Sequence, residues 1–238
     1  MTTIPPVRAL LFDVFGTLVD WRTSIAQDLA TFGCEREITC DWFAFVDAWR
    51  GAYAPSMERV RCGIEPWQNI DTLHAASFDT LAPEFGLPEF APEDRAWIVR
   101  RWHELRPWSD TREGLARLHA RYALGTLSNG NVALLVDLVR FADLRIDLLA
   151  SAELFRRYKP DPEVYLGAVE LLGLEPASVM LVAAHNGDLA AAAALGLRTA
   201  FVARPTEYGT GQKNDLAPDA EYDVAVRGLG ELADRLGA

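Results

Sequence analysis

Polar side chains that could do chemistry directly follow three apolar stretches of this sequence. They are, in chain order, Asp13, Ser128 with Asn129, and Asp188. A carboxylate at the end of a buried strand is costly unless it has a partner or a chemical role. Ligands of an open parallel sheet bind outside the carboxyl ends of its strands, so we expect these side chains to converge. Lys159 is a further candidate for this group, as a cation. It lies just before a helix that we expect to start at Asp161 and Pro162.

Asp13 is the candidate nucleophile of this group. An ionised carboxylate can displace a leaving group and form an ester, which water then hydrolyses. A nearby Lys159 would favour its charged form, and Thr17 would orient it by a hydrogen bond. Two residues after Asp13, where a second acid could serve as proton donor, the sequence has Phe15. The alternatives are that Asp13 caps backbone amides at a strand end and that Thr17 is a turn hydroxyl.

Strands and helices must alternate to bring these residues together. Apolar stretches predict strands, and helical patterns lie between the later ones. We expect strands at 7–13, 122–128, 147–151, 179–184 and 198–203, and helices at 111–120, 131–140 and 189–195. This alternation predicts an α/β fold with a doubly wound, Rossmann-like parallel sheet.

Residues 21–103 break this rhythm, with many Trp and Phe residues at helical spacing. One such series is Trp42, Phe43, Phe45, Val46 and Trp49, and we interpret most of it as a core-facing stripe. Since the segment follows the first strand directly, we predict an inserted helical cap at 21–103. Residues 1–20 and 104–238 would form the catalytic core.

Composition and charge exclude several classes of function and location. Half of the 238 residues are hydrophobic, but no run of about 18 apolar residues predicts a membrane span. The first six residues hold no basic residue before an apolar stretch, so no signal peptide is expected. Three cysteines without metal-ligand spacing (Cys34, Cys40 and Cys62) fit a reduced, cytoplasmic protein. The net charge of −11 argues against nucleic acid and anionic membranes as partners.

Four ordered segments, 9–17, 122–130, 158–165 and 179–188, together resemble the haloacid dehalogenase superfamily. Most members are phosphatases that carry a second Asp where this chain has Phe15, and further acids for magnesium. Here Asp188 is followed by Leu189 and a run of Ala, which offers few oxygen ligands. The chain instead resembles the namesake subgroup, the (S)-2-haloacid dehalogenases, which has an aromatic residue at that place.

The resemblance implies roles for several further residues. Trp49-Arg50 matches a halide-binding Arg preceded by Trp on a cap helix, and Asn129 would also receive the halide. Ser128 would donate to the substrate carboxylate, with a plain strand-end turn residue as an equal alternative. Lys159 and Tyr165 match a Lys with a Tyr six positions on. Phe15 and Trp67 would form apolar walls around the alkyl group. Without the resemblance, Arg50 reads as an exposed helix residue, and for Trp67 plain core packing is an equal alternative.

The last segment, residues 183–188, matches the subgroup only in part. Asp188 aligns, but His185 stands where an Asn is usual and Gly187 where a Trp is usual. Asp188 would pair with Lys159, and either Asp188 or His185 would activate the hydrolytic water. The unperturbed pKa of a histidine lies near neutrality, which suits a base; the alternative for His185 is a hydrogen-bonded structural His.

The sequence therefore predicts a hydrolase that converts short (S)-2-haloalkanoic acids to (R)-2-hydroxy acids without a metal or organic cofactor. A small anionic haloacid would be its substrate, attracted by Arg50 and Lys159 against the overall negative charge. The resemblance also implies a homodimer. A haloacetate or fluoroacetate dehalogenase, a magnesium-dependent phosphatase and a non-catalytic binding protein on the same scaffold remain alternatives.

Overall fold

A parallel sheet forms the centre of the protein, whose computed structural model describes residues 6–238. Its six strands lie in the order β5-β4-β1-β6-β7-β8, and every neighbouring pair is parallel. They are β1 (Ala9–Phe12), β4 (Ala123–Ser128), β5 (Leu148–Ser151), β6 (Val179–Ala183), β7 (Arg198–Val202) and β8 (Val224–Val226). Every residue of β1 and β6 is buried, which explains why these strands are apolar without alternation.

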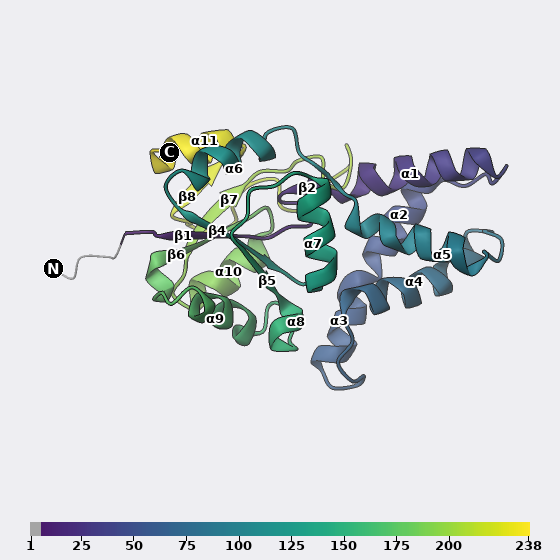
Figure 1. Cartoon of the computed structure of the whole chain (residues 1–238), viewed down its shortest axis with the longest axis horizontal. Coiled ribbons are helices and arrows are strands. Elements are labelled where there is room, and N and C mark those ends of the chain that lie inside the picture. Colours follow the sequence, from purple (N-terminus) through teal and green to yellow (C-terminus); the bar gives the residue numbers. More distant parts are fainter. Residues whose placement is uncertain (1–5) are drawn as a thin grey trace.

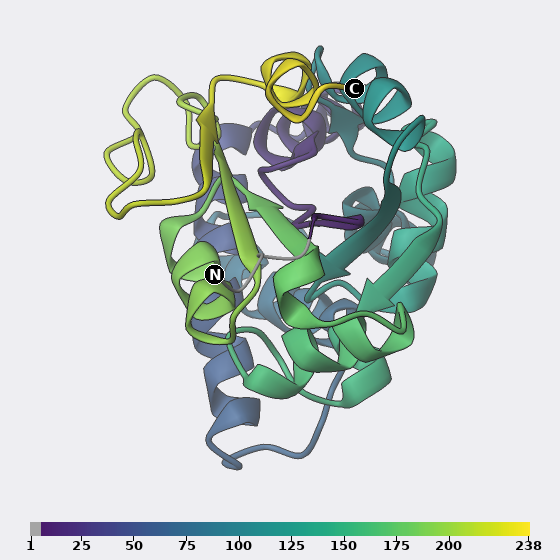
Figure 2. The same cartoon turned by 90° about the vertical axis from the view of Figure 1, so that its left-hand side faces the viewer.

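Helices cover both faces of this sheet. They are α6 (Thr111–His119), α7 (Val132–Phe141), α8 (Ala152–Phe155), α9 (Pro162–Leu171), α10 (Asn186–Ala194) and α11 (Leu229–Leu236), with a short 3₁₀ helix η2 (Pro176–Ser178). In Figure 1, α6 and α11 lie above the sheet and α9 lies below it, and Figure 2 shows the same two layers from the end. The doubly wound, Rossmann-like α/β fold predicted from the sequence is confirmed.

Five of the six sheet strands coincide with predicted apolar stretches. The sixth, β8, holds only three residues, and only Val226 in it is buried, so its pattern is too short to recognise in the sequence. The prediction that no signal peptide precedes the first strand rests mainly on residues 1–5, which lie outside the described residues.

Residues 21–103 are helical and gather at one end of the molecule, away from β8 and α11 (Figure 1). The helices are α1 (Trp21–Glu35), α2 (Trp42–Gly51), α3 (Tyr53–Arg61), α4 (Ile70–Glu84), α5 (Pro92–Val99) and the 3₁₀ helix η1 (Arg100–His103). A two-stranded antiparallel ribbon, β2 (Val19–Asp20) with β3 (Arg106–Pro107), lies where the chain leaves and re-enters the sheet region. None of the helices among residues 6–238 is long and apolar enough to cross a membrane.

Aromatic side chains form the interior of this helical segment. Most of the predicted series in α2 is buried, namely Trp42, Phe45, Val46 and Trp49. Phe43 is the exception: it is 42% exposed, and the guanidinium of Arg22 lies over its ring. Phe45 packs edge-on against Phe78 of α4, with ring centroids 6.0 Å apart. The stripe therefore fixes α2 against its neighbours, and with it the residue at its end, Arg50.

Candidate active site

Asp13 occupies the first turn after the central strand β1. Gly16, with φ of +87°, turns the chain away from the strand in a conformation that favours glycine. This turn brings Thr17 back beneath Asp13, where its Oγ1 donates to Asp13 Oδ2 at 2.8 Å. The same hydroxyl accepts from the backbone N–H of Ala184, at 2.9 Å, after the neighbouring strand β6. Thr17 thus fixes the carboxylate to two strands at once, as predicted for an orienting hydroxyl.

Lys159 lies between Asp13 and Asp188. Its Nζ donates to Asp13 Oδ1 at 2.9 Å and to Asp188 Oδ2 at 2.5 Å. The Tyr165 hydroxyl donates to the other oxygen, Asp188 Oδ1, at 2.5 Å. Asn129 holds the backbone of Lys159 in place, because its Oδ1 accepts from the backbone N–H of Lys159 at 2.8 Å. The structure therefore brings together four of the residues expected to converge, Asp13, Asn129, Lys159 and Asp188, and adds Tyr165 to them.

Asp13 and Lys159 each stabilise the ionised form of the other. Burial by itself would raise the pKa of Asp13, but the attraction of Lys159 and a hydrogen bond from His185 hold that pKa well below its usual range. Burial would lower the pKa of Lys159, but its two carboxylate partners raise it above the usual value. At neutral pH Asp13 is consequently ionised, which a nucleophile requires.

His185 precedes α10 and joins Asp13 to a second buried carboxylate. Its Nδ1 lies 3.1 Å from Asp13 Oδ2, and its Nε2 lies 2.9 Å from Glu207 Oε2. Glu207 is only 1% exposed and also accepts from the indole N–H of Trp21 at 2.9 Å. Burial opposes a charge on His185, but the two carboxylates raise its pKa well above the ordinary value.

Arg50, at the end of α2, presents a cation that carries no carboxylate partner within ion-pair distance among the described residues. Its Nε and Nη1 are buried and lack a hydrogen-bond partner. The guanidinium lies instead over the ring of Tyr53, 4.1 Å from the ring centroid, and 5.5 Å from that of Trp21. A buried, unpaired guanidinium beside a nucleophile is suited to receive an anion.

A pocket of about 300 Å³ connects Arg50 with Asp13. Phe15 forms an apolar wall, held edge-on by Tyr53 and by Trp102, with centroid distances of 6.2 and 5.8 Å. The pocket is lined by Asp13, Phe15, Arg50, Tyr53, Asn129, Lys159, Pro160, Tyr165, His185, Gly187 and Asp188. Gly187 faces open space, since a Cβ there would meet no atom within 4 Å.

Two predicted residues lie elsewhere. The structure corrects the expectation for Trp67, whose ring packs against Tyr158 at a centroid distance of 4.7 Å and borders a different, smaller pocket. Trp67 therefore has the alternative role given above, which is plain core packing. Ser128 is fully buried, and its Oγ accepts from the backbone N–H of Gly130 at 3.1 Å. Ser128 therefore shapes the turn that carries Asn129 and is not among the pocket-lining residues.

Sequence reasoning missed Glu207 and Tyr53. Glu207 lies in the segment after the predicted strand 198–203, so the strand-end argument used for Asp13 could have found it. Tyr53 lies three residues after Arg50 and hence one helical turn on, a spacing that could have indicated contact.

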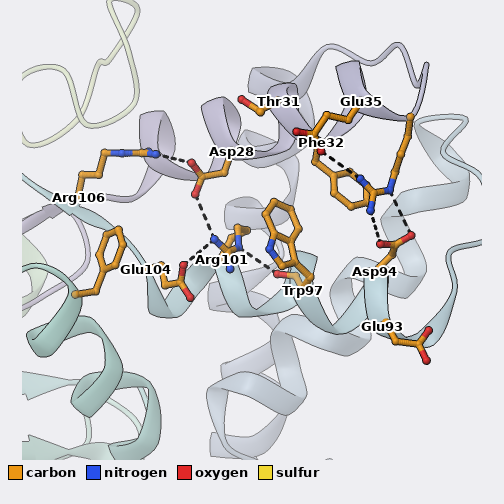
Figure 3. A pocket seen from close by; sticks show the side chains of 12 residues that line it. Asp28, Thr31, Phe32, Glu35, Glu93, Asp94, Trp97, Arg101, Glu104 and Arg106 are labelled. Atoms are coloured by element: carbon orange, nitrogen blue, oxygen red, sulfur yellow. Dashed lines mark hydrogen bonds and ion pairs between the residues drawn. The ribbon is translucent and has the colours of Figure 1, made fainter.

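A second depression, of about 590 Å³, lies between α1, α5 and η1 (Figure 3). Its three cations are already paired: Arg36 with Asp94 at 2.8 Å, Arg101 with Glu104 at 2.8 Å, and Arg106 with Asp28 at 2.5 Å. Because these cations are neutralised by carboxylates of the same depression, it is a weaker candidate for an anion site than the pocket beside Arg50.

Among residues 6–238, no group of three or more His, Cys, Asp or Glu side chains has an arrangement that could hold a metal ion. That the reaction proceeds without a cofactor stays a prediction.

An ionised, lysine-paired Asp at the carboxyl end of a parallel sheet, under a helical segment that supplies a cation, defines a hydrolase with a carboxylate nucleophile. The chain belongs to the haloacid dehalogenase-like hydrolases, whose family model matches residues 7–196. This confirms the family expected from the four ordered segments.

Its relatives include dehalogenases of 2-haloacids. The chain is 30% identical over 218 residues to (S)-2-haloacid dehalogenase 1 of Pseudomonas sp. (strain CBS-3), a match that covers 85% of this chain and 88% of that protein. A solved L-2-haloacid dehalogenase is 51% identical, with a TM-score of 0.95, and the match covers 97% of this chain and 99% of that one. A solved defluorinating L-2-haloacid dehalogenase is 43% identical, also with a TM-score of 0.95, covering 98% and 96%.

Proposed function

We propose that the protein is an (S)-2-haloacid dehalogenase that hydrolyses the carbon–halogen bond of short 2-haloalkanoic acids. The observation that carries this proposal is that one pocket holds both an ionised Asp13 and the guanidinium of Arg50, whose Nε and Nη1 have no hydrogen-bond partner. The first supplies a nucleophile and the second a place for the departing halide. The similarity to 2-haloacid dehalogenases supports the same substrate class.

In the first step, a carboxylate oxygen of Asp13 attacks carbon 2 of the substrate as the carbon–halogen bond breaks. The bonding pair leaves with the halide, which Arg50 and the Asn129 side chain receive as its charge develops. Phe15 packs against the alkyl group. The attack inverts carbon 2 and leaves an ester on Asp13. Arg50 and Lys159 provide the local positive charge that draws an anionic substrate to a protein of net charge −11.

In the second step, water attacks the carboxyl carbon of Asp13, so the inverted configuration at carbon 2 is retained and an (R)-2-hydroxy acid is released. Lys159, held by Asp188 and Tyr165, stabilises the charge that returns to Asp13. Asp188 and His185 are the two candidates for activating the water.

The test is halide release from (S)- and (R)-2-chloropropionate in the presence of a chelator, with Asp13→Ala as the comparison. We expect release from the (S) form only, and none from the variant. Halide release by Asp13→Ala at the wild-type rate would refute the assigned nucleophile.

One alternative within the family has a specific observation in its favour. The similarity to a defluorinating L-2-haloacid dehalogenase makes haloacetates the next substrates to try. A magnesium-dependent phosphatase is disfavoured by Phe15, which packs in the place of a second acid. Release of phosphate from phosphate esters with magnesium, and not of halide, would favour it.

The domain organisation belongs to the same proposal. Residues 21–103 would act as a cap that carries Arg50, and residues 1–20 with 104–238 as the catalytic core. We also propose a cytoplasmic location, supported by three free thiols, Cys34, Cys40 and Cys62. The family resemblance supports a homodimer, which light scattering would test.

A further inference from the structure

The pocket that holds Asp13 and Arg50 reaches solvent at one rim. Of the eleven residues that line it, nine are buried or half-buried, and only Pro160 and Gly187 are exposed. The inner part of the pocket is enclosed, since Asp13 is 7% and Phe15 only 2% exposed. The pocket therefore runs from the buried nucleophile to a rim formed by Pro160 and Gly187.

The backbone at this rim does not require the glycine. Gly187 is the second residue of α10, and it is not among the glycines with a positive φ. Glycine weakens a helix, because it loses more conformational freedom on folding than any other residue. Helix stability by itself would therefore favour a side chain at position 187.

Close packing does not require the glycine either. A Cβ at Gly187 would meet no atom within 4 Å, whereas one at Gly16 would lie 2.1 Å from Glu207 Oε1. Four glycines combine such open space with a φ that is not positive, namely Gly51, Gly187, Gly211 and Gly230. Of these four, only Gly187 lines the pocket. Its missing side chain therefore provides free space at the rim.

The pocket offers more space than the smallest 2-haloacids need. Its volume is about 300 Å³, which is room for about ten groups the size of a water molecule, at about 30 Å³ each. This number exceeds the non-hydrogen atoms of 2-chloropropionate. The remaining space can hold further carbon atoms of an alkyl chain.

The charges in the pocket leave the rim to that alkyl chain. Displacement at carbon 2 directs the halide away from Asp13 and toward Arg50, and the substrate carboxylate is attracted by the cations Arg50 and Lys159. The alkyl chain is the uncharged substituent. Pro160 and Gly187, which carry neither charge nor a polar side chain, are therefore the lining residues that suit it.

The polar neighbours of Gly187 do not oppose this path, because their polar atoms are engaged inside the site. Asp188 accepts from Lys159 and Tyr165. His185 lies between Asp13 and Glu207, with a nitrogen within hydrogen-bond distance of each. An alkyl chain that passes over the rim thus breaks none of these hydrogen bonds.

We propose that the alkyl chain of the substrate leaves the pocket between Pro160 and Gly187, and that Gly187 is the residue that determines chain length. The enzyme then accepts 2-haloalkanoic acids with chains well beyond the methyl group of a 2-halopropionate, such as 2-bromohexanoate. This inference rests on the proposed function, since it assumes displacement at carbon 2 by Asp13.

The experiment measures bromide release from (S)-2-bromopropionate and (S)-2-bromohexanoate by wild type, Gly187→Leu and the control Gly230→Leu. Gly230 is a matched control, because it is the second residue of α11, also has open space at its Cβ position and does not line the pocket. Leu is a better helix former than Gly, so neither substitution should lower Tm. The readout is the ratio of kcat/KM for the hexanoate to kcat/KM for the propionate.

A methylene group that does not fit a pocket costs about 10- to 200-fold in kcat/KM. For wild type we therefore expect the two values of kcat/KM to agree within about tenfold. Gly187→Leu places a branched side chain at the rim and should lower the ratio by about 10- to 200-fold. Gly230→Leu should keep the wild-type ratio.

Three results would overturn the inference. One is a wild-type kcat/KM for the hexanoate more than about tenfold below that for the propionate, a measurement that needs no variant to fold. Another is an unchanged ratio in Gly187→Leu, and the third is an equal loss of both substrates in that variant. In each case, bromide release from the propionate by wild type would still support the proposed function. Absence of bromide release from either substrate in wild type would instead refute the proposed function itself.

Discussion

Replacing Arg50 by Met should separate activity from stability. In the free enzyme, Nε and Nη1 of Arg50 are buried without a partner. An unsatisfied buried group costs about 1–3 kcal/mol, so these two N–H groups together cost about 2–6 kcal/mol.

The cation–π contacts of Arg50 offset part of this cost. The guanidinium lies 4.1 Å from the Tyr53 ring and 5.5 Å from the Trp21 ring. Such contacts contribute about 0.5–2 kcal/mol each. Met fills a similar volume without a charge or a donor, so Arg50→Met should leave the free energy of unfolding unchanged or raise it by up to about 2 kcal/mol.

Activity should respond in the opposite direction. Removing a group that stabilises charge in the transition state costs roughly 10²–10³ in kcat. We therefore expect Arg50→Met to lose halide release by that factor while its Tm stays level or rises by up to about 8 °C, at about 2–4 °C per kcal/mol for a chain of this size.

Bromide provides the matched assay, because a ligand at 100 times its Kd stabilises a protein by about 2.7 kcal/mol. Thermal unfolding with and without bromide should show stabilisation of wild type and none of Arg50→Met. A loss of more than about 2 kcal/mol in the variant, or an equal bromide effect in both proteins, would refute the reasoning that Arg50 is held ready for an anion.

Two further predictions concern buried charges. Lys159→Met leaves Asp13 and Asp188 without their shared cation. It should lower the free energy of unfolding, measured in urea, by about 3–5 kcal/mol, whereas the exposed control Lys213→Met should change it little. Equal effects of the two substitutions would contradict this prediction. His103 is buried between Asp71 at 3.0 Å and Asp137 at 2.7 Å, and although burial opposes its charge, both carboxylates raise its pKa. The stabilisation that charged His103 provides is complete below the unfolded pKa of 6.5 and is lost as pH rises through the folded pKa. His103→Gln should therefore lower the free energy of unfolding by about 1–3 kcal/mol at pH 5.5 and clearly less at pH 9. A loss that does not vary with pH would exclude a charged bridge.

The strand ends could be predicted from the sequence because each is a local signal. Asp13, Asn129 and Asp188 follow apolar stretches, and in a parallel sheet that position alone places them at the same edge. Lys159 was found because a cation before a helix start gains nothing from the helix dipole and so needed another explanation.

Residues whose role depends on distant packing were harder to predict. Trp67 lies in an aromatic-rich segment, but which rings face the pocket depends on how α2, α3 and α4 pack, and Trp67 faces Tyr158 instead. Glu207 follows a predicted strand, but its approach to His185 depends on the space that Gly16 leaves for it, and Gly16 and Glu207 lie far apart in the sequence. Local patterns identify the catalytic edge, whereas the orientation of the helical segment decides what surrounds it.

The central claim is that Asp13 forms the ester, and a single turnover in ¹⁸O-labelled water tests it most directly. With enzyme in excess over (S)-2-chloropropionate, the oxygen that reaches carbon 2 comes from the Asp13 carboxylate. We expect a hydroxy acid with unlabelled oxygen at carbon 2 and one ¹⁸O in the peptide that contains Asp13. Label at carbon 2 of the product in that first turnover, with none in the peptide, would show that water attacks the substrate directly and that Asp13 forms no ester.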